Sequence, residues 1–321
     1  MYRKFTKPTV VISKCLEFEA CRYNGLKISF DPLTLMIPHI DFVPICPEVE
    51  IGLGTPRDPI RIVKKKNITL VQPSTNKKLT LDMNQFSNLF LDNLETVDGF
   101  ILKAKSPSCA IKDAKYYYKK DKEQSAGKGP GLFTKKVLKL FPCLAIEDEG
   151  RLRNFHIREH FLTKLFALSS FRNIKKINKI SALIKYHADN KFLMMAYNEK
   201  LMRILGKVVA SYDKSNLTKV FKLYEKNLQL VFEKPYKRKT NINVLMHAMG
   251  FFSKLLTKKE KKFILDLFQQ YLDRRIPLSA LIQVVRSWIT RYENNYLENQ
   301  TYFEPYPFEL MDISNSGKGN L

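Results

Sequence analysis

The sequence predicts an α/β amino-terminal domain, built on a parallel sheet with flanking helices, followed by an all-α carboxyl-terminal domain. In residues 1–118, short β-branched runs alternate with a segment of helical periodicity, as in strand–helix–strand units. From Phe133 onward the apolar residues recur at helical spacing. The chain has 321 residues, 45% of them hydrophobic and 27% charged, which is enough apolar material for two packed cores.

Short β-branched runs predict the strands of the first domain. Between residues 79 and 94 the apolar positions instead fall at helical spacing, so we expect a helix there. This alternation favours a parallel sheet with helices on its faces. The predicted strands are Thr9–Ser13, Phe42–Ile45, Ile60–Val63, Ile68–Gln72 and Phe100–Leu102.

Residues 119–130 have the composition of a linker. The segment is charged, poor in aliphatic side chains and ends in Gly-Lys-Gly-Pro-Gly. Its glycine spacing does not make a phosphate loop, because no Lys-Ser or Lys-Thr follows the last glycine. The predicted organisation is a domain over 1–118, the linker over 119–130, a helical domain over 131–312 and a disordered tail over 313–321.

Capping signals mark the helices of the second domain. Ser215 is expected to cap a helix over 217–231. Thr257 and Glu260 form the pattern of a capping box at the start of the next-but-one helix. Pro277 stands at the beginning of the last long apolar stripe, where proline is favoured.

The chain is strongly basic, with 55 Lys and Arg against 31 Asp and Glu and a net charge of +24. Residues 1–130 carry 21 basic and 14 acidic side chains, whereas 131–321 carry 34 and 17. Such an excess is typical of proteins that bind polyanions, above all nucleic acid, although a lysine-rich genome produces the same composition. The second domain is therefore the expected polyanion surface.

One basic run combines cations with an aromatic side chain. Residues 234–239 (KPYKRK) are expected to form a loop, and this combination suits single-stranded or loop RNA. The candidate RNA contacts are Lys234, Lys237, Arg238, Lys239, Arg151 and Arg153.

No apolar run approaches the roughly 18 residues that a membrane span needs. The apolar run near the first residues is too short for the core of a signal peptide, so we expect a cytosolic protein. Five cysteines in a reducing compartment argue against a disulfide framework. They leave buried thiols, a metal site or a nucleophile as the alternatives.

Three of the cysteines follow predicted strands. Cys15, Cys46 and Cys109 are separated by 31 and 63 residues, yet the carboxyl ends of parallel strands gather at one edge of a sheet. Three thiolates suit zinc or an iron–sulfur cluster, and structural zinc sites usually show close CxxC pairs, which this sequence does not have. A cluster held by three cysteines leaves one iron open as a Lewis acid. Buried strand-end thiols are the alternative interpretation.

Five motifs occur in order within residues 8 to about 118. They are Ser13-Lys14-Cys15-Leu16, Cys21-Arg22-Tyr23-Asn24-Gly25, residues 42–54 (FVPICPEVEIGLG), Pro56-Arg57-Asp58-Pro59 and residues 98–109 (DGFILKAKSPSC). Together they resemble the thiouracil desulfidase family. The remainder looks like a helical domain of unknown function that is often fused behind it. The chain departs from the family pattern at Asn24, often Asp, and at Ala110, often Gly.

The resemblance implies a [4Fe–4S] cluster on Cys15, Cys46 and Cys109, whose open iron takes up the sulfur of a thiocarbonyl. Water then supplies the oxygen without net redox change. It also implies catalytic roles for Glu48 and for a serine of the Ser-Pro-Ser-Cys motif, with Ser106 favoured over Ser108. Replacing C=S by C=O does need a base to activate water and a hydrogen bond to the pyrimidine. Without the resemblance, Glu48 is better explained as a helix amino-terminal residue after Pro47.

The resemblance therefore predicts a desulfidase that converts 4-thiouridine in tRNA to uridine. The α/β domain would carry the chemistry and the helical domain would hold tRNA. One alternative is a desulfidase of free thiouracil or thionucleosides, and another is a non-catalytic RNA-binding iron–sulfur protein. The charge of the second domain favours tRNA over a neutral small substrate. Cys21 and Cys143 are expected to be structural thiols.

Overall fold

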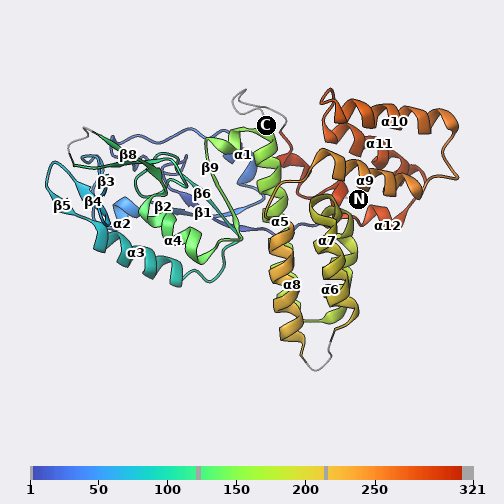
Figure 1. Ribbon diagram of the computed structural model, residues 1–321, viewed down its shortest axis with the longest axis horizontal. Coiled ribbons are helices and arrows are strands. Elements are labelled where there is room, and N and C mark those ends of the chain that lie inside the picture. Colours follow the sequence, from blue (N-terminus) through green and yellow to red (C-terminus); the bar gives the residue numbers. More distant parts are fainter. Residues whose placement is uncertain (1–2, 121–123, 213–215, 313–321) are drawn as a thin grey trace. The chain divides into compact units, whose positions relative to one another are not determined.

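The computed structural model describes residues 3–120, 124–212 and 216–312, which form two compact units (Figure 1). The α/β unit comprises Phe5–Ser169 and the described residues from Pro307 onward. The helical unit comprises Ser170–Tyr306 with the described residues up to Lys4. The boundary between them lies inside the long helix α5 (Phe155–Ile177).

A four-stranded sheet with the order β2-β1-β6-β9 forms the centre of the α/β unit. All neighbouring strands are parallel, so their carboxyl ends meet at one edge. Its central strand β1 is apolar because both faces of the sheet are covered there, and the side chains from Val10 to Ile12 are fully buried. The strands are β1 (Thr9–Ser13), β2 (Asp41–Ile45), β6 (Gly99–Leu102) and β9 (Ala145–Asp148).

A second, mixed sheet of five strands has the order β5-β4-β3-β7-β8. Here β3 pairs antiparallel with β4 and parallel with β7, and β7 pairs antiparallel with β8. The strands are β3 (Arg61–Lys64), β4 (Ile68–Gln72), β5 (Lys77–Lys78), β7 (Ala114–Tyr117) and β8 (Ser125–Gly129).

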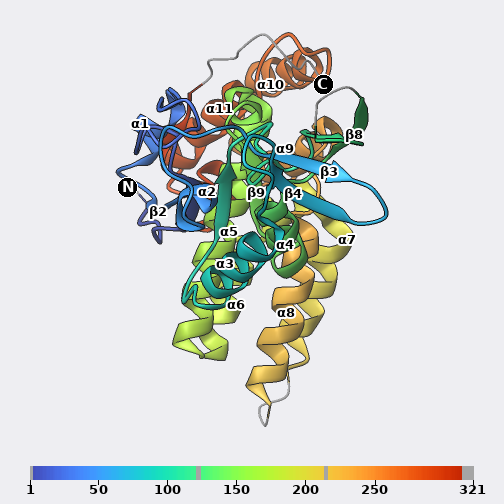
Figure 2. The same cartoon turned by 90° about the vertical axis from the view of Figure 1, so that its left-hand side faces the viewer.

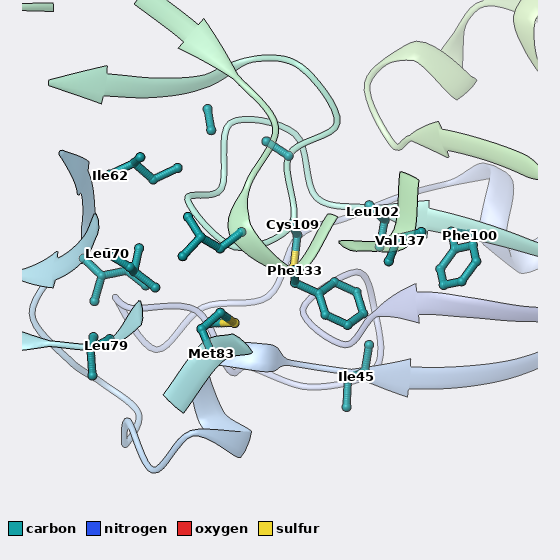
Figure 3. Close-up of a cluster of buried hydrophobic side chains, with 14 of the residues drawn as sticks. Ile45, Ile62, Leu70, Leu79, Met83, Phe100, Leu102, Cys109, Phe133 and Val137 are labelled. Carbon is teal, nitrogen blue, oxygen red and sulfur yellow. The ribbon is translucent and has the colours of Figure 1, made fainter. Parts of the chain in front are cut away.

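Helices α3 and α4 pack against each other beside the sheets, as Figure 2 shows. Their contact is aromatic, because Phe86 and Phe90 of α3 both meet the ring of Phe133 from α4. Figure 3 shows the core that they cover, in which Phe133 and Met83 lie among side chains from both sheets. The helices of this unit, besides α5, are α1 (Pro32–Met36), α2 (Pro47–Glu50), α3 (Thr80–Asp92) and α4 (Leu132–Leu140), with 3₁₀ turns at Arg151–Arg153 and Phe308–Leu310.

In the helical unit α7 packs against both α6 and α8, and α9 joins α7 to the helices that follow. The side chain of Tyr224 is fully buried at this junction, where its hydroxyl lies 3.0 Å from Nδ1 of His187. The helices are α6 (Ile180–Asp189), α7 (Lys191–Ala210), α8 (Leu217–Val231), α9 (Arg238–Gly250), α10 (Lys258–Leu272), α11 (Leu278–Arg291) and α12 (Asn295–Glu298), with a 3₁₀ turn at Thr301–Phe303.

The predicted fold class is confirmed. The five predicted strands and the helix over 79–94 are all present within one or two residues of the expected bounds. The capping box of Thr257 and Glu260 is also present, because the threonine hydroxyl and the glutamate carboxylate each bond to the other's backbone. No helix in the described ranges is long and apolar enough to cross a membrane.

The predicted linker over 119–130 is wrong in its carboxyl-terminal half. Residues 125–129 form strand β8, which pairs with β7 to close a hairpin on the second sheet. The sequence of this strand, SAGKG, does not alternate apolar and polar residues, so periodicity could not predict it. The strand forms because its backbone pairs with β7. The predicted tail at 313–321 lies outside the described residues.

The helical domain does not begin at residue 131 as predicted. Helix α4 and strand β9 both belong to the α/β unit, which continues to Ser169. Strand β9 is only four residues long and pairs with β6, more than 40 residues earlier in the chain. Ser215 lies outside the described residues, and the cap of α8 is Asn216, whose side chain accepts a hydrogen bond from the Lys219 amide.

Candidate functional site

The carboxyl ends of β2, β1 and β6 carry the three predicted cluster cysteines. Cys15 lies two residues after β1, Cys46 directly follows β2 and caps α2, and Cys109 lies in the turn after β6. All three line one cavity of about 340 Å³. The parallel register of neighbouring strands thus brings together thiols that are far apart in the sequence.

A fourth thiol lies at the same place. Cys21 is 1% exposed, packs with Cys15 and Cys46, and lines the cavity. Its spacing of six residues from Cys15 left open a role as a replacement ligand or a resolving thiol, but the sequence interpretation favoured a structural thiol. Cys143 does not line the cavity and is half-buried elsewhere in the α/β unit.

Burial controls the protonation of these thiols in the metal-free chain. It raises the pKa of Cys46 to about 12 and that of Cys109 to about 11. A hydrogen bond with Cys21, together with burial, raises the pKa of Cys15, and the same bond lowers the pKa of Cys21 to about 7. The three predicted ligands are therefore neutral thiols that must lose protons when a metal binds.

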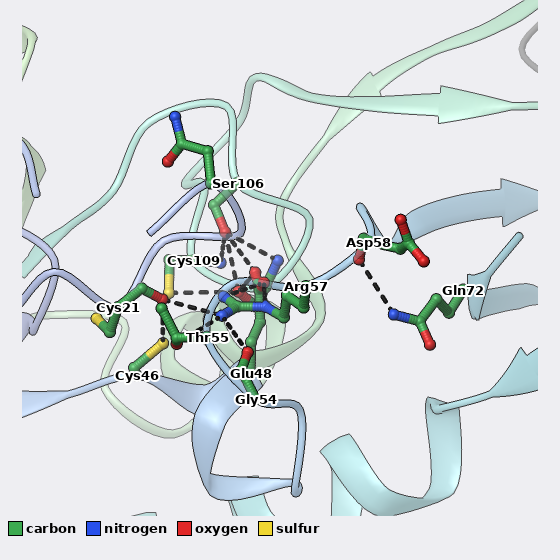
Figure 4. Close-up of polar contacts among 12 residues, drawn as sticks. Cys21, Cys46, Glu48, Gly54, Thr55, Arg57, Asp58, Gln72, Ser106 and Cys109 are labelled. Atoms are coloured by element: carbon green, nitrogen blue, oxygen red, sulfur yellow. Dashed lines mark hydrogen bonds and ion pairs between the residues drawn. The ribbon is translucent and has the colours of Figure 1, made fainter. Parts of the chain in front are cut away.

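Glu48 joins the thiols to a hydrogen-bonded group of side chains (Figure 4). It lies in the first turn of α2, and its Oε1 accepts hydrogen bonds from Ser108 Oγ at 2.7 Å and Ser106 Oγ at 3.3 Å. Its Oε2 accepts from the Nη2 and Nε atoms of Arg57 at 2.7 and 3.2 Å. All of these groups donate hydrogen bonds to Glu48, and an ionised carboxylate has only acceptor atoms with which to receive them.

The two serines have different surroundings. Ser108 is 1% exposed, and its hydroxyl also lies 3.5 Å from the sulfur of Cys109. Ser106 is half-buried, and its Oγ accepts the backbone N–H groups of Ser108 and Cys109 at 3.2 and 3.1 Å. These two amides use the lone pairs of the Ser106 oxygen. The hydroxyl hydrogen can therefore be donated to Glu48, to Ser108 or to a bound substrate.

Arg57 is a site residue that the sequence interpretation missed. Its side chain is 6% exposed and forms the ion pair with Glu48, and its Nη1 donates to the carbonyl oxygens of Cys21 at 3.0 Å and Gly54 at 3.1 Å. The guanidinium therefore fixes the carboxylate relative to the Cys21 segment. Its signal in the sequence was the Pro56-Arg57-Asp58-Pro59 motif, which carried no assigned role.

Lys103 and Glu149 form a second missed pair at the cavity wall. The ammonium group of Lys103 lies 2.5 Å from Glu149 Oε1, and the Ala104 amide donates to Glu149 Oε2 at 2.8 Å. The Lys103 amide in turn donates to Ser13 Oγ at 2.9 Å. These bonds connect the ends of β1, β6 and β9, so the edge that carries the cysteines is held together by polar contacts as well as by the sheet.

The loop that carries Ser108 and Cys109 is held by the start of α4. Thr134 Oγ1 donates to the Cys109 carbonyl at 2.6 Å, and the Thr134 amide donates to the Ser108 carbonyl at 3.2 Å. A Cβ at Gly131 would lie 2.3 Å from the Ser108 carbonyl oxygen, so only glycine fits. Ala110, where the family often has glycine, does not have a positive φ and is accommodated without strain.

The predicted RNA contacts are divided between the two units. Arg151 and Arg153 belong to the α/β unit, where they pair with Glu147 and Asp31. Arg238 begins α9 instead of lying in a loop, and it is half-buried. Its Nη1 donates to the Tyr271 carbonyl at 2.9 Å, and its guanidinium lies 4.8 Å from the Tyr271 ring centre. The remaining candidates, Lys234, Lys237 and Lys239, are exposed on the helical unit.

Within the described part of the chain, no three His, Cys, Asp or Glu side chains lie close enough to hold a single ion. A four-iron cluster binds each cysteine through a different iron, so its ligands stand further apart. Three thiols that line one cavity are a donor set that a cluster of this kind could use.

Comparison with known proteins agrees with this geometry. Residues 10–149, which contain every side chain of the cavity, match the family described as 2-thiouracil desulfurase. These residues belong to the 2-thiouracil desulfurase family. Residues 191–307 match a family described as a protein of unknown function, DUF1722, so the chain combines a 2-thiouracil desulfurase domain with a DUF1722 domain.

Individual relatives match parts of the chain. The uncharacterized protein YbgA of Escherichia coli is 27% identical over 158 residues, which is 49% of this chain and 93% of YbgA. The uncharacterized protein YbbK of Bacillus subtilis is 27% identical over 109 residues, or 31% of this chain and 72% of YbbK. Among solved structures, the [4Fe-4S]-dependent thiouracil desulfidase TudS matches with a TM-score of 0.38 and 25% identity, over 46% of this chain and 93% of TudS.

Proposed function

We propose that this 2-thiouracil desulfurase domain replaces the sulfur of a thiocarbonyl by oxygen and releases sulfide, using a [4Fe–4S] cluster held by Cys15, Cys46 and Cys109. The observation that supports this most is the common cavity: three thiols and the Glu48 carboxylate line it together. A soft, thiophilic metal centre and a hard base are the two groups that exchange of C=S for C=O requires.

When bound, the cluster would supply an open iron that binds the thiocarbonyl sulfur and polarises the carbon. The protein side chains supply the remainder. Glu48 accepts a proton from the attacking water, and Ser106 donates a hydrogen bond to the pyrimidine ring or passes the proton on. Both serines already bond to Glu48, so the proton has a continuous path along the carboxylate and the two hydroxyls. Arg57 orients the carboxylate and takes no proton.

The proposed substrate is 4-thiouridine in tRNA. Ser170–Tyr306 alone carries 26 basic and 11 acidic side chains, so the positive charge is concentrated in the helical unit. That charge does not increase the affinity for a neutral free base, whereas each phosphate contact increases the affinity for an RNA. The exposed lysines Lys234, Lys237 and Lys239 are the candidate contacts, and Arg238 supports them from the base of α9.

The test begins with anaerobically reconstituted full-length protein. A broad absorption band near about 400 nm and iron and sulfide in equal amounts, about four of each per chain, are the expected result. The loaded protein should then convert thiolated tRNA to uridine-containing tRNA and release sulfide. A loaded protein that acts on free 4-thiouracil at the same kcat/KM as on tRNA would support the free-base alternative. A loaded protein inactive on every thiocarbonyl would support the non-catalytic alternative.

A further inference from the structure

The second sheet of the α/β unit carries a concentrated positive charge. Residues 60–78 and 114–129, which contain its five strands, have eleven basic side chains and two acidic ones. The other residues of 1–130 have ten basic and twelve acidic side chains. The positive charge of this part of the sequence therefore lies on one sheet, whose strands β3, β4, β5 and β8 are grouped at one end of the unit in Figure 1.

Strand pairing places four of the cations in one row. Arg61 of β3 is paired with Val71 of β4, which is paired with Lys78 of β5. On its other side Arg61 neighbours Lys115 of β7, because the residues that follow each of them are paired. Lys115 is in turn paired with Lys128 of β8. Side chains of residues paired directly across strands project from the same face, so the row crosses all five strands on one face of the sheet.

The row lies on the solvent side of the sheet. Its three lysines are exposed, and Arg61 is half-buried with its guanidinium 5.8 Å from the ring centre of Tyr117. The β3–β4 turn adds three more exposed lysines, Lys64, Lys65 and Lys66. The opposite face packs into the core through Ile62, Leu70 and Tyr116. We refer to the four cations of the row and the three lysines of the turn as the basic sheet face.

The basic sheet face has no carboxylate partner in the part of the chain that the structure describes. The described residues of 60–78 and 114–129 contain no Asp or Glu, because Asp121 and Glu123 lie outside them. No ion pair among the described residues involves any of the seven cations. Lys115 and Lys128 are moreover directly opposite each other, and like charges in this position destabilise a sheet.

Protection of the sheet edges explains only part of the row. Lysines on edge strands prevent two sheets from pairing, which accounts for Lys78 on β5 and Lys128 on β8. Arg61 and Lys115 lie on β3 and β7, which are paired on both sides within the sheet. Their charges do not protect an edge. The repulsion along the row is offset when an anionic ligand binds to it.

The length of the row and its aromatic neighbours indicate the class of this ligand. Neighbouring strands lie about 4.8 Å apart, so the row is roughly 19 Å long and a single phosphate would cover only part of it. Tyr117 under Arg61 and the 54% exposed Tyr118 add aromatic rings to the cations, a combination that suits RNA. Tyr118 is the only large exposed hydrophobic residue among the described residues of this sheet, whereas an amphipathic membrane-binding surface inserts several apolar side chains.

We propose that the basic sheet face binds the phosphate backbone of RNA. Charge-assisted hydrogen bonds from its lysines and from Arg61 to phosphate oxygens would hold the RNA without reading its sequence. The inference rests on the proposed tRNA substrate and deepens it, because it gives the catalytic unit RNA contacts of its own in addition to those of the helical unit. The seven cations do not line the cavity, so they act on the RNA and not on the reacting base.

The direct test is binding of labelled, unmodified tRNA to the full chain, which needs neither cluster nor turnover. In Lys78→Gln/Lys115→Gln/Lys128→Gln, called the sheet variant, the slope of log K against log salt should become shallower by about 2 to 3. Arg61 is left unchanged because it contacts Tyr117. The matched control removes the same charge from exposed lysines of the α/β unit outside the sheet, as Lys112→Gln/Lys135→Gln/Lys139→Gln, and should keep the slope.

Three binding results would overturn the proposal. The first is an unchanged slope in the sheet variant. The second is an equal reduction in the control, because only net charge would then matter. The third is loss of binding to vesicles of phosphatidylserine and phosphatidylcholine in the sheet variant while its tRNA slope is unchanged, which would assign the face to a lipid surface.

Thermal unfolding provides a readout of opposite sign. Without RNA and at low salt, the sheet variant should unfold at a higher temperature than the unchanged chain, because a like-charge pair across β7 and β8 has been removed. The difference should shrink as salt screens the repulsion. A lower unfolding temperature would mean that these lysines stabilise the sheet, and would contradict their assignment to a ligand.

Turnover separates this inference from the proposed function. Cluster-loaded protein is assayed with thiolated tRNA and with free 4-thiouridine, and the ratio of the two kcat/KM values should fall in the sheet variant. A ratio equal to that of the unchanged protein would remove the basic sheet face from tRNA recognition and leave the desulfidase. Absence of turnover on either substrate, with the salt slope still changed, would remove the desulfidase function and leave the RNA-binding face.

Discussion

Ser108 donates a 2.7 Å hydrogen bond to Glu48, although 60 residues separate the two in the chain. The bond links the loop after β6, which holds Cys109, to helix α2, which begins after Cys46. Glu48 is bound on its other oxygen by Arg57. The Glu48 carboxylate thus connects the segments that carry two of the proposed cluster ligands. It binds no metal in the proposed site, so a change at Glu48 should alter activity, whereas a change at a cysteine should alter cluster content.

Serine substitutions distinguish the proposed ligands from the other thiols. Cys15→Ser, Cys46→Ser and Cys109→Ser should each abolish cluster loading, because a hydroxyl is a poor ligand for iron in a cluster. Cys143→Ser is the matched control, since this residue lies away from the cavity, and Cys21→Ser should also retain iron. Iron and sulfide analysis after anaerobic reconstitution measures the result. Full loading in any of the first three variants would remove that residue from the ligand set.

Glu48→Gln tests the proposed base. The amide keeps the size of the side chain but cannot take a proton, so cluster content should remain normal while kcat falls by about a hundredfold or more. Glu50→Gln provides the control, because Glu50 is an exposed residue of the same helix and does not line the cavity. Activity and iron content are measured on the same preparations. Equal activity of Glu48→Gln and Glu50→Gln would shift the base to another group.

Gly131→Ala tests the packing of α4 on the ligand loop. The added methyl group would lie 2.3 Å from the Ser108 carbonyl oxygen, so either the loop or the helix must move. We expect a destabilisation of about 1–3 kcal/mol and reduced iron loading. Gly250→Ala is the comparison, because a Cβ there meets nothing within 4 Å. Thermal unfolding and iron content report the two effects, and a variant equal to Gly250→Ala in both would show that the loop is not held at this point.

The half-buried histidine His187 predicts a pH dependence of stability. Burial lowers its pKa from 6.5 to about 4. Between these two pH values the imidazole is protonated in the unfolded chain and neutral in the folded chain. The stabilisation is complete above about pH 6.5 and is lost as the pH falls toward 4, by up to about 2 kcal/mol after allowing for partial exposure.

The measurement is the unfolding free energy of the full chain at several pH values between these limits. His187→Gln keeps a hydrogen-bonding group beside Tyr224 but does not titrate, so its stability should fall less steeply. Some slope should remain in this variant, because burial also lowers the pKa of His160 to about 4. An identical slope in both proteins would mean that folding does not change the pKa of His187.

The exposed lysines of the helical unit predict salt-dependent binding of tRNA. With about five phosphate contacts, log K should fall with log salt with a slope of roughly −3 to −5. Neutralising Lys234, Lys237 and Lys239 together should reduce this slope by about 2 to 3. Arg238 is left unchanged because it bonds to the Tyr271 carbonyl, and its loss would disturb the fold. Fluorescence anisotropy with labelled tRNA measures both slopes, and an unchanged slope would place the tRNA surface elsewhere.

Much of the site follows from sequence patterns that act over short distances. The run Thr9–Ser13 is β-branched, and its strand has the predicted bounds. The strands before Cys46 and Cys109 end where predicted and begin one residue earlier, so the position of each cysteine after a strand end is a local property. Since parallel strands share a carboxyl edge, local patterns were sufficient to predict that the three thiols would meet.

The partners of these residues were decided only by the tertiary structure. The ion pairs of Arg57 with Glu48 and of Lys103 with Glu149 depend on which loops the sheet edge brings together. Strand β8 contains no apolar alternation, and it exists because β7 offers it a hydrogen-bonding edge. The free energy that stabilises such a strand or ion pair comes from contacts with residues distant in the chain. The local pattern of apolar residues therefore cannot predict it. The sequence by itself thus determined the three strand-end cysteines and the strands that precede them, while long-range packing decided which side chains Glu48 and Lys103 contact.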